Sequence, residues 1–533
     1  MASTTKPRWM RGMLAGAAAI ATAIALVGCT GGGGADQGGG SDQGGGSSSG
    51  SNQGGSVTII AAGPIASWDP VVSIQPTIPG LATDRLLAVY GALLYVDSQS
   101  AVIPHMAESL TTDDFVTWTL KIRPGIEFTD GTPYDAAAVK YNWDRAAADG
   151  SALVGVASTM TTKVVDDLTL EIVLDAPNPV FDRTVAEQLA FIASPTALEE
   201  QGKDYTDPVG AGPFMLKSWD PAVGEELVRN PGYFLEGKPH VDELNFVIIA
   251  DPAQRVATVL QGGADIMNNY RFALLDVLGE PGVSTYEVAS GGLRMFIMNN
   301  TVAPFDDVRA RQAAALAIDN TELVQTLTQD PEETGWAGLF PASSRLYNGD
   351  YNIGSNDPAA AQALVDELKA EGIDMSIRIV APAVPETIRA GELLQLQLQA
   401  VGFDAQLEQV PLADWADLAR VRHDFDITFY PGIYDLNNAP VSMTQLFEGG
   451  ENIAQYQSAE MAEALSEARE SRNESEMIAA FKKVQEIYQK DVPFVVYGID
   501  ERLFFHRDAV AGFEAIGRGM LLTENLYRTD VSN

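Results

Sequence analysis

The sequence predicts an α/β fold divided into more than one lobe. In the second half, segments typical of strands alternate with segments typical of helices, as at 376–380, 386–401 and 405–410. This alternation indicates an α/β lobe with a largely parallel sheet. The chain has 533 residues, which suffices for two or three domains or lobes with separate cores. Its hydrophobic content of 46% is that of a soluble globular protein.

The N-terminal segment has the pattern of a secretory signal. Lys6, Arg8 and Arg11 form a basic tip, and an uncharged, mostly apolar run follows at 12–27. This run is too short to span the hydrocarbon core of a bilayer, which needs about 20 apolar residues. The ending Leu-Val-Gly-Cys29 resembles the lipobox of bacterial lipoproteins, in which the cysteine carries the lipid, palmitate included. A signal-anchor helix with an incidental cysteine is the alternative.

A flexible tether follows this cysteine. Residues 30–56 contain 13 Gly and 6 Ser, the composition of a flexible coil. A coil of this length spans roughly 30 Å on average. We therefore expect a signal peptide at 1–28, a lipidated Cys29 with its tether at 29–56, and a folded part held at the outer face of the cell membrane.

The chain is strongly acidic, with a formal net charge of −38. Removal of the three basic signal residues takes this charge to −41 in the mature chain. Such a charge argues against nucleic acid as a partner, because nucleic-acid binding needs a basic surface. It also argues against electrostatic adhesion to anionic lipid. An acidic surface keeps a secreted protein dispersed and monomeric, and attraction of cationic ligands is the alternative role.

The first half is expected to be rich in strands. Two helices are expected there, at 83–95 and at 135–147, and Asp135 is the N-cap of the second. The expected strands are short apolar or alternating runs bounded by turn residues, at 57–61, 115–123, 168–174, 214–219, 226–229 and 244–249.

The second half contains more helix. Expected helices lie at 308–318, 358–368, 386–401, 458–470 and 475–489. Expected strands lie at 376–380, 405–410, 425–430 and 492–498. The last of these helices carries one apolar stripe, which we expect to pack in the core: Ile478, Phe481, Val484, Ile487 and Tyr488.

Motifs for catalysis, cofactors and metals are missing from the sequence. There is no GxSxG motif, and the one cysteine has no partner for a disulfide or a zinc cluster. The run 232–238 imitates a phosphate-binding loop, but Pro239 stands where a Ser or Thr must reach magnesium. The four His residues are scattered. We therefore predict neither an enzyme nor a bound cofactor or metal.

Six segments, in order along the chain, resemble the extracellular solute-binding protein family 5. This family comprises the peptide, oligopeptide and nickel-type binding proteins of ABC importers. The segments are 104–110 (PHMAESL), 118–131 (WTLKIRPGIEFTDG), 208–214 (PVGAGPF), 229–234 (RNPGYF), 261–266 (QGGADI) and 304–319 (PFDDVRARQAAALAID). Each segment alone is a weak signal, but their order behind a lipoprotein signal is a specific one.

The resemblance implies a two-lobed fold of the periplasmic-binding-protein type (cluster C), with two hinge crossovers near 295–298 and 495–498. Closure of the two lobes over a solute would present one face to a membrane permease. The implied parts are lobe I at 57–294, an inserted subdomain within it at about 91–206, lobe II at 295–498, and a return to lobe I at 499–533.

The resemblance also points to a ligand loop. In peptide-binding members, a loop after a strand of lobe II carries an acidic residue that pairs with the amino terminus of the ligand. The matching stretch is 431–440 (PGIYDLNNAP), in which Asp435 would be that carboxylate, with Gly432 and Tyr434 beside it. Ile433 and Ala439 depart from the family pattern, so Asp435 as an ordinary turn residue stays an alternative.

Further residues could line the pocket. Aromatic residues near expected strand ends could form its walls, or could pack in the core instead: Trp68, Trp336, Trp415, Tyr430 and Tyr434. Arg294 and Arg389 are candidates for pairing with a carboxylate.

The sequence therefore predicts an extracytoplasmic substrate-binding protein that captures a small solute, most simply a short peptide, and delivers it to an ABC permease. A receptor of the same fold for a sugar, for a metal chelate or for signalling is the alternative. A secreted hydrolase would need a nucleophile or a metal, for which the sequence has no motif.

Overall fold

The computed structural model describes residues 53–61, 63–73, 83–97, 101–148, 151, 153–202, 204–270, 274, 277–288, 292–336, 338–340, 344–350, 356–432, 439–449, 452–499, 502–516 and 520–530. Three large sheets organise this part of the chain, with seven, five and four strands. No helix among these residues has both the length and the hydropathy needed to cross a bilayer.

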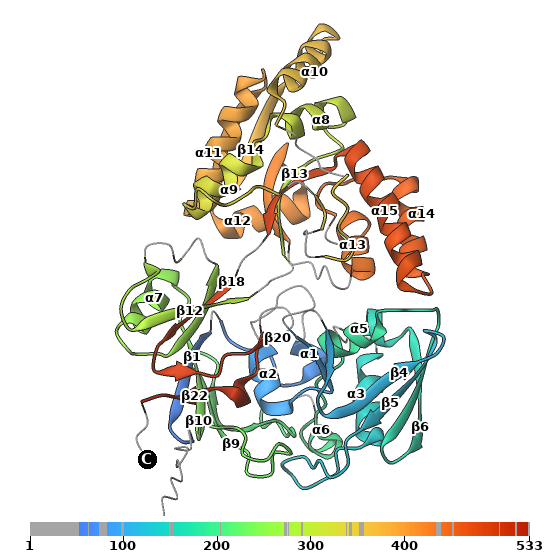
Figure 1. Cartoon of the computed structure of the whole chain (residues 1–533), viewed down its shortest axis with the longest axis vertical. Helices are drawn as coiled ribbons and strands as arrows, with labels where there is room; N and C mark the ends of the chain where they lie inside the picture. The colour runs from blue at the N-terminus through green and yellow to red at the C-terminus, as the bar shows by residue number, and fades with distance from the viewer. Residues whose placement is uncertain are drawn as a thin grey trace, which may run out of the picture. The chain divides into compact units, whose positions relative to one another are not determined.

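The seven-stranded sheet contains strands from near both ends of the described chain. Its order is β12-β18-β11-β1-β10-β9-β8. The strands are β1 (Ser56–Ala61), β8 (Phe214–Asp220), β9 (Gly224–Arg229), β10 (Glu243–Ile248), β11 (Ile266–Tyr270), β12 (Val283–Val288) and β18 (Arg502–Arg507). The central strand β1 runs parallel to β10 and β11, and the other pairs are antiparallel. Figure 1 shows β18, drawn in red, beside the green β12.

Short helices accompany this sheet and the four-stranded one. They are α1 (Pro70–Ser73), α2 (Thr83–Tyr90), α3 (Ala136–Ala146), α4 (Val154–Ala157), α5 (Phe181–Gln188), α6 (Pro195–Gln201) and α7 (Pro252–Leu260). The N-cap prediction for α3 is confirmed, because the Asp135 carboxylate accepts a hydrogen bond from Ala138 N at 2.8 Å.

The predicted helix at 83–95 is too long. It ends at Tyr90, and Gly91 follows with φ +64°, a conformation that stops a helix. Residues beyond it form β2 (Leu94–Val96), which pairs with β3 (Val102–Pro104).

A four-stranded sheet lies within the segment predicted as the inserted subdomain. Its order is β4-β5-β7-β6, and all three pairs are antiparallel. Its strands are β4 (Ala107–Thr112), β5 (Thr117–Ile122), β6 (Met160–Asp166) and β7 (Thr169–Leu174). Buried and exposed residues alternate along β5 and β7, so one face of this sheet packs in a core and the other meets solvent.

The five-stranded sheet has the order β15-β14-β16-β13-β17. The strands are β13 (Leu293–Met298), β14 (Ser376–Pro382), β15 (Asp404–Val410), β16 (Ile427–Gly432) and β17 (Phe494–Ile499). The prediction of a largely parallel sheet is wrong for one half: β14 pairs in parallel with β15 and β16, but β13 is antiparallel to β16 and β17. The α/β alternation surrounds only β14 and β15, and the antiparallel pairs join strands that are distant along the chain.

Helices flank this sheet and fill most of the second half. They are α8 (Val308–Ala317), α9 (Asn320–Thr328), α10 (Pro358–Ala370), α11 (Pro385–Ala400), α12 (Leu412–Asp417), α13 (Ala439–Phe447), α14 (Ala459–Arg469) and α15 (Glu474–Asp491). Four residues of the stripe predicted on α15 are buried, but Ile478 is 40% exposed and Met477 is buried in its place.

Two extended hydrophobic clusters correspond to these sheets. One contains the buried residues of the five-stranded sheet and its helices, from Leu293 to Tyr497, together with Val180. The other contains residues of the seven- and four-stranded sheets and of the C-terminal segment, up to Leu526. That segment also contains the short pairs β19 (Val510–Ala511) with β22 (Tyr527–Arg528), and β20 (Ala515–Ile516) with β21 (Met520–Leu521).

The chain passes between the two larger sheets twice. It leaves the seven-stranded sheet after Val288 and enters the five-stranded sheet at Leu293, and it returns between Ile499 and Arg502. The segments 295–298 and 495–498, near which the crossovers were expected, lie within β13 and β17. The lobe boundaries at 294 and 498 stay predictions, a few residues from these changes of sheet.

Candidate functional site

The site begins at one edge of the five-stranded sheet. Leu293, at the start of β13, pairs with Gly432 at the end of β16 and with Ile499 at the end of β17. In the same register Arg294 lies opposite Pro431 and Gly498. The antiparallel pairing thus brings the start of one strand and the ends of its two neighbours to one edge. Both passages between the large sheets leave from this edge.

The end of β14 and the start of α11 lie at the same edge. Val380 of β14 pairs in parallel with Thr428 of β16, so Pro382 reaches the level of Tyr430. Helix α11 starts at Pro385, directly after this end, and carries Arg389 in its second turn. Arg389 is half-buried, and its Nε is buried with no hydrogen-bond partner among the described atoms. A buried donor without a partner needs an explanation, and a polar ligand at this edge would provide one.

Tyr430 and Trp415 form an aromatic pair beside this edge. Their ring centroids lie 6.3 Å apart with an interplanar angle of 28°, a stacked arrangement. Trp415 Nε1 donates a hydrogen bond to Thr428 Oγ1 at 2.9 Å, and this hydroxyl donates to the carbonyl of Val380 at 2.8 Å. Helix α12 is thereby fixed to β16 and β14 at the end of both strands.

Arg420 contacts the same tyrosine and was not predicted from the sequence. Its guanidinium donates to the Tyr430 hydroxyl, and Cζ lies 5.1 Å from the centroid of the Tyr430 ring. Arg420 belongs to a π-helical turn, Leu418–Arg422, that continues α12. In a regular α-helix, residues 415 and 420 would lie on different sides of the helix. Their spacing in the sequence therefore does not predict that both contact Tyr430.

A second group of residues follows β1 of the seven-stranded sheet. The carboxyl ends of β11 and β12 and the start of β18 meet at one edge, since Tyr270 and Val288 both pair with Arg502. β1 runs parallel to β11, so the loop after Ala61 leaves from this edge as well. This loop contains Trp68. The end of β12 and the start of β18, which lie at this edge, are the points from which the chain passes to and from the edge that holds Arg294.

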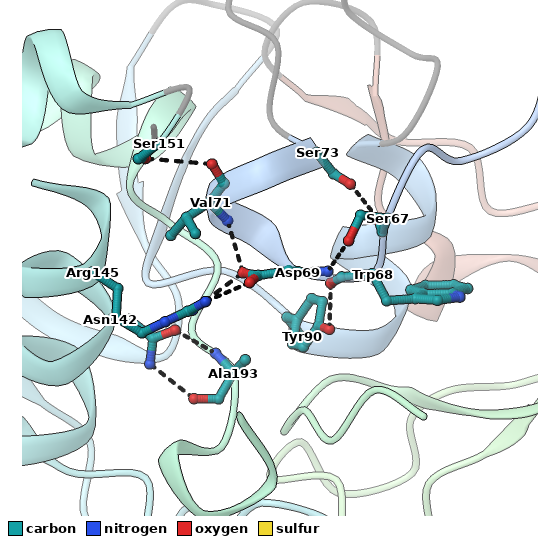
Figure 2. A network of polar contacts seen from close by, with 10 residues as sticks. All are labelled: Ser67, Trp68, Asp69, Val71, Ser73, Tyr90, Asn142, Arg145, Ser151 and Ala193. Carbon is teal, nitrogen blue, oxygen red and sulfur yellow. Dashed lines mark hydrogen bonds and ion pairs between the residues drawn. The ribbon is translucent and has the colours of Figure 1, made fainter. Parts of the chain in front are cut away.

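Trp68 lies deep in this loop. Its side chain is 0% exposed and packs edge-to-face on Trp219, with ring centroids 6.2 Å apart. The Tyr90 hydroxyl donates to the Trp68 carbonyl at 2.7 Å (Figure 2). Burial raises the pKa of Tyr90 well above its usual value, so this hydroxyl keeps its proton. In this structure Trp68 is core packing for the loop.

The next residue, Asp69, ties the loop to α3. Figure 2 shows its carboxylate between the loop and Arg145, whose Nη1 lies 3.1 Å from Oδ1 while Nη2 contacts Oδ2. The carboxylate also accepts a hydrogen bond from Val71 N at 3.2 Å. Asn142, one turn earlier on α3, bonds to the backbone of Ala193 through both ends of its amide, at 2.8 and 3.2 Å. This network fixes the loop from two directions.

A buried ion pair supports the start of the same loop. Arg85 Nε lies 2.9 Å from Glu225 Oε2, and both side chains are almost fully buried. Arg85 Nη2 also donates to the carbonyl of Gly63 at 2.9 Å. Burial lowers the pKa of Arg85 and raises that of Glu225. Removal of either partner would leave a buried charge without compensation.

The structure thus places Arg294, Tyr430, Gly432, Arg389 and Trp415 around one sheet edge, and Trp68 in the loop after β1. Asp435, Tyr434 and Cys29 lie outside the described residues. No group of three His, Cys, Asp or Glu side chains in the described part has the arrangement of a metal site.

Residues 101–454 match the family described as "Bacterial extracellular solute-binding proteins, family 5 Middle". The chain belongs to this family. The match covers more than half of the chain and includes all of the five-stranded sheet except β17.

Relatives and solved structures agree with this membership. The glutathione-binding protein GsiB of Salmonella paratyphi A is 27% identical over 489 residues, which cover 86% of this chain and 94% of that protein. The ABC transporter substrate-binding protein CtaP of Listeria monocytogenes has a similar structure, with a TM-score of 0.79, 19% identity, and coverage of 90% of this chain and 100% of that one. The oligopeptide-binding protein AppA of Bacillus subtilis, solved with a nonapeptide, is also similar in structure. Its TM-score is 0.72 and its sequence identity 18%, and the match covers 90% of this chain and 99% of that one.

These findings confirm the main sequence predictions. The fold is the two-lobed α/β fold of the family 5 binding proteins. The protein is an extracellular solute-binding protein of family 5, and proteins of this family bind solutes and are not enzymes.

Proposed function

We propose that this protein captures a short peptide between its two lobes and delivers it to the permease of an ABC importer. The observation that carries the proposal is the convergence of Arg294, Arg389, Tyr430 and Gly432 at the sheet edge from which both passages between the sheets leave. The relatives support the ligand class, since GsiB is named for glutathione and AppA was solved with a nonapeptide.

A peptide has chemical groups that suit the residues of this region. Its carboxylate would pair with Arg294 or Arg389, because a guanidinium donates two parallel hydrogen bonds to a carboxylate. Its ammonium group would pair with Asp435, and the rings of Tyr430, Tyr434 and Trp415 would support the walls. In a site closed from water these charged hydrogen bonds are stronger than at a free surface.

Closure of the lobes would transmit occupancy to the permease. We assign lobe I to 57–294 and 499–533, with an inserted subdomain at about 91–206, and lobe II to 295–498. The chain changes sheet twice, between Val288 and Leu293 and between Ile499 and Arg502, and a hinge requires only a few residues that absorb backbone rotation. The solute would favour the closed form by contacting both lobes at once.

We further propose that the mature protein is a monomer anchored by lipid on Cys29 at the outer face of the cell membrane. Replacement of Cys29 by Ala should abolish incorporation of labelled palmitate and release the protein from membranes, whereas Ser41→Ala in the tether should change neither. Labelling that survives Cys29→Ala would refute the anchor without affecting the binding proposal.

The binding proposal is tested with a chain that begins at Gln53. The purified protein is studied by native mass spectrometry, then denatured, and the released molecule is identified. We expect a short peptide, retained by the wild type and lost by the Asp435→Ala and Arg294→Met variants. Arg345→Met, which removes an exposed arginine paired with Glu474 at 3.1 Å, is the control that should retain it. A released sugar or metal chelate would refute the peptide class and keep the family function.

A further inference from the structure

Two residues of one helical segment hold Tyr430 in place. Trp415 stacks on its ring at 6.3 Å, and Arg420 lies over the ring and donates to its hydroxyl. Tyr430 is only 4% exposed as a result. We call Trp415, Arg420, Thr428 and Tyr430 the Tyr430 clamp.

The clamp depends on an irregular helix. Successive residues of an α-helix differ in direction by about 100°, so positions five apart would diverge by roughly 140°. Here the helix widens after Asp417 into a π turn, which the N–H of His423 closes by donating to the Leu418 carbonyl. The wider turn lets Trp415 and Arg420 reach the same side chain. Single π turns of this kind are frequent at functional sites.

The clamp is anchored in the sheet as well as in the helix. Thr428, two residues before Tyr430 on the same face of β16, is 0% exposed and receives the hydrogen bond of Trp415. Its own proton bonds to the Val380 carbonyl of β14. On the other side, Tyr430 pairs with Met295 of β13, the neighbour of Arg294. The orientation of Tyr430 is therefore set at the point where three strands reach the candidate site.

We propose that Arg420 is a positioning residue for solute binding, which acts by fixing Tyr430 and the end of β16. The inference rests on the proposed function of this edge. A planar guanidinium can stack on the ring and donate to the hydroxyl at the same time, whereas the ammonium of a lysine can do only part of this. Fixing the edge before the solute arrives reduces the ordering cost of binding.

The first test needs no solute. Hydrogen–deuterium exchange is followed in the segment Ile427–Gly432 of the solute-free protein. Arg420→Met should raise exchange there, and Arg420→Lys should raise it less. Arg422→Met is the matched control in the same π turn, because Arg422 pairs with Asp417 at 2.7 Å on the surface and should leave exchange unchanged. Equal exchange in the Arg420→Met variant and the control would overturn the proposal.

The second test measures binding of trialanine, tetraalanine and pentaalanine by calorimetry. For the peptide that the wild type binds most tightly, Arg420→Met and Tyr430→Phe should each raise Kd about tenfold, and the double variant should lose little more, since both remove one interaction. Arg420→Lys should restore part of the affinity, and Arg422→Met should change nothing.

The outcomes separate the two proposals. Additive losses in the double variant, or equal losses in Arg422→Met, would show that Arg420 does not act through Tyr430 and would overturn the clamp. If none of the three peptides binds the wild type, the peptide assignment loses its support, and the exchange experiment alone decides whether Arg420 positions the edge.

Discussion

Asp307 illustrates how one carboxylate can serve a local and a tertiary purpose. It caps the N-terminus of α8 by accepting a hydrogen bond from Arg309 N at 2.8 Å, and it binds the Arg309 guanidinium at 2.7 Å. The same guanidinium reaches Glu367 and Glu371 of the α10 region, each at 2.8 Å. The hydrogen bond from Arg309 is the main reason that the pKa of Asp307 lies below its usual value of 3.8.

This depressed pKa predicts a pH dependence of stability. The stabilisation by ionised Asp307 is fully present above about pH 4 and is lost as the pH falls through the lower pKa of the folded state. Asp307→Asn should therefore cost about 1 kcal/mol at pH 7, and this difference should shrink below pH 4. Thermal melts from pH 2.5 to 7 measure it. Asp306→Asn removes the same charge one residue earlier, and a loss of equal size there would contradict the assignment.

At the residue scale, the sequence predicted identities better than surroundings. The family pattern suggested only the loop around Asp435, whereas the aromatic residues were chosen because they lie near expected strand ends and the two arginines because they can pair with a carboxylate. Five of the predicted residues lie around one sheet edge in the structure, and their contact with a ligand stays a prediction. Arg420 could not be predicted, because its contact with Tyr430 depends on a π turn that no residue spacing signals. Trp68 was expected as a possible pocket wall, but Trp219, 151 positions further along the chain, covers it.

At the scale of elements, the packing of the segment 208–214 explains why this family motif needs glycine at two positions. A Cβ added to Gly212 would lie 2.6 Å from the carbonyl carbon of Val89, and one added to Gly210 would lie 2.1 Å from its oxygen. Gly212 N also donates to this carbonyl at 2.9 Å. The motif therefore packs, backbone against backbone, on the end of α2, a contact between segments more than a hundred residues apart.

This close approach predicts that one added methyl group at position 212 strongly destabilises the fold. Gly212→Ala should lower the free energy of unfolding by about 3 kcal/mol, because the facing atoms belong to backbone and cannot move aside. Urea unfolding measures the change. Gly155→Ala, in the short helix α4 with open space around the new methyl group, should be neutral or stabilising by about 0.5 kcal/mol. Equal effects of the two substitutions would refute the packing argument.

Most strands and helices could be predicted because their apolar period is local. The end of α2 at Tyr90 was missed, since the apolar residues continue past Gly91 into β2. The antiparallel half of the five-stranded sheet was missed for a different reason. Its strands β13, β16 and β17 come from distant parts of the chain, and no local pattern encodes which strands become neighbours.

At the scale of the whole molecule, the two large sheets differ in how the chain builds them. The five-stranded sheet and its helices come from one continuous stretch, 292–499, which supplies all of its hydrophobic cluster except Val180. The seven-stranded sheet needs β18 between β11 and β12, and Arg528 Nη1 donates to the Ser56 carbonyl at 3.1 Å.

This difference predicts the behaviour of fragments. Residues 292–499 expressed alone should unfold cooperatively in urea, because their core is nearly complete. Residues 53–288 alone should associate, since β11 and β12 would have unpaired edges. Size-exclusion chromatography and circular dichroism measure both properties. A monomeric, cooperatively folded 53–288 fragment would contradict this view.

The position of β18 also sets an order of events during synthesis. A nascent chain emerges N-terminus first, so β1, β8–β12 and the whole five-stranded sheet appear before Arg502 does. Until residues 502–530 have emerged, β11 and β12 in the first half of the chain have unpaired edges. The five-stranded sheet, which is synthesised later, can already fold at this stage. The first half of the chain would therefore need a chaperone that recognises exposed β-edges for the longest time. A chain that is interrupted shortly before its C-terminus would lack β18, so its seven-stranded sheet, which begins with β1, would stay incomplete.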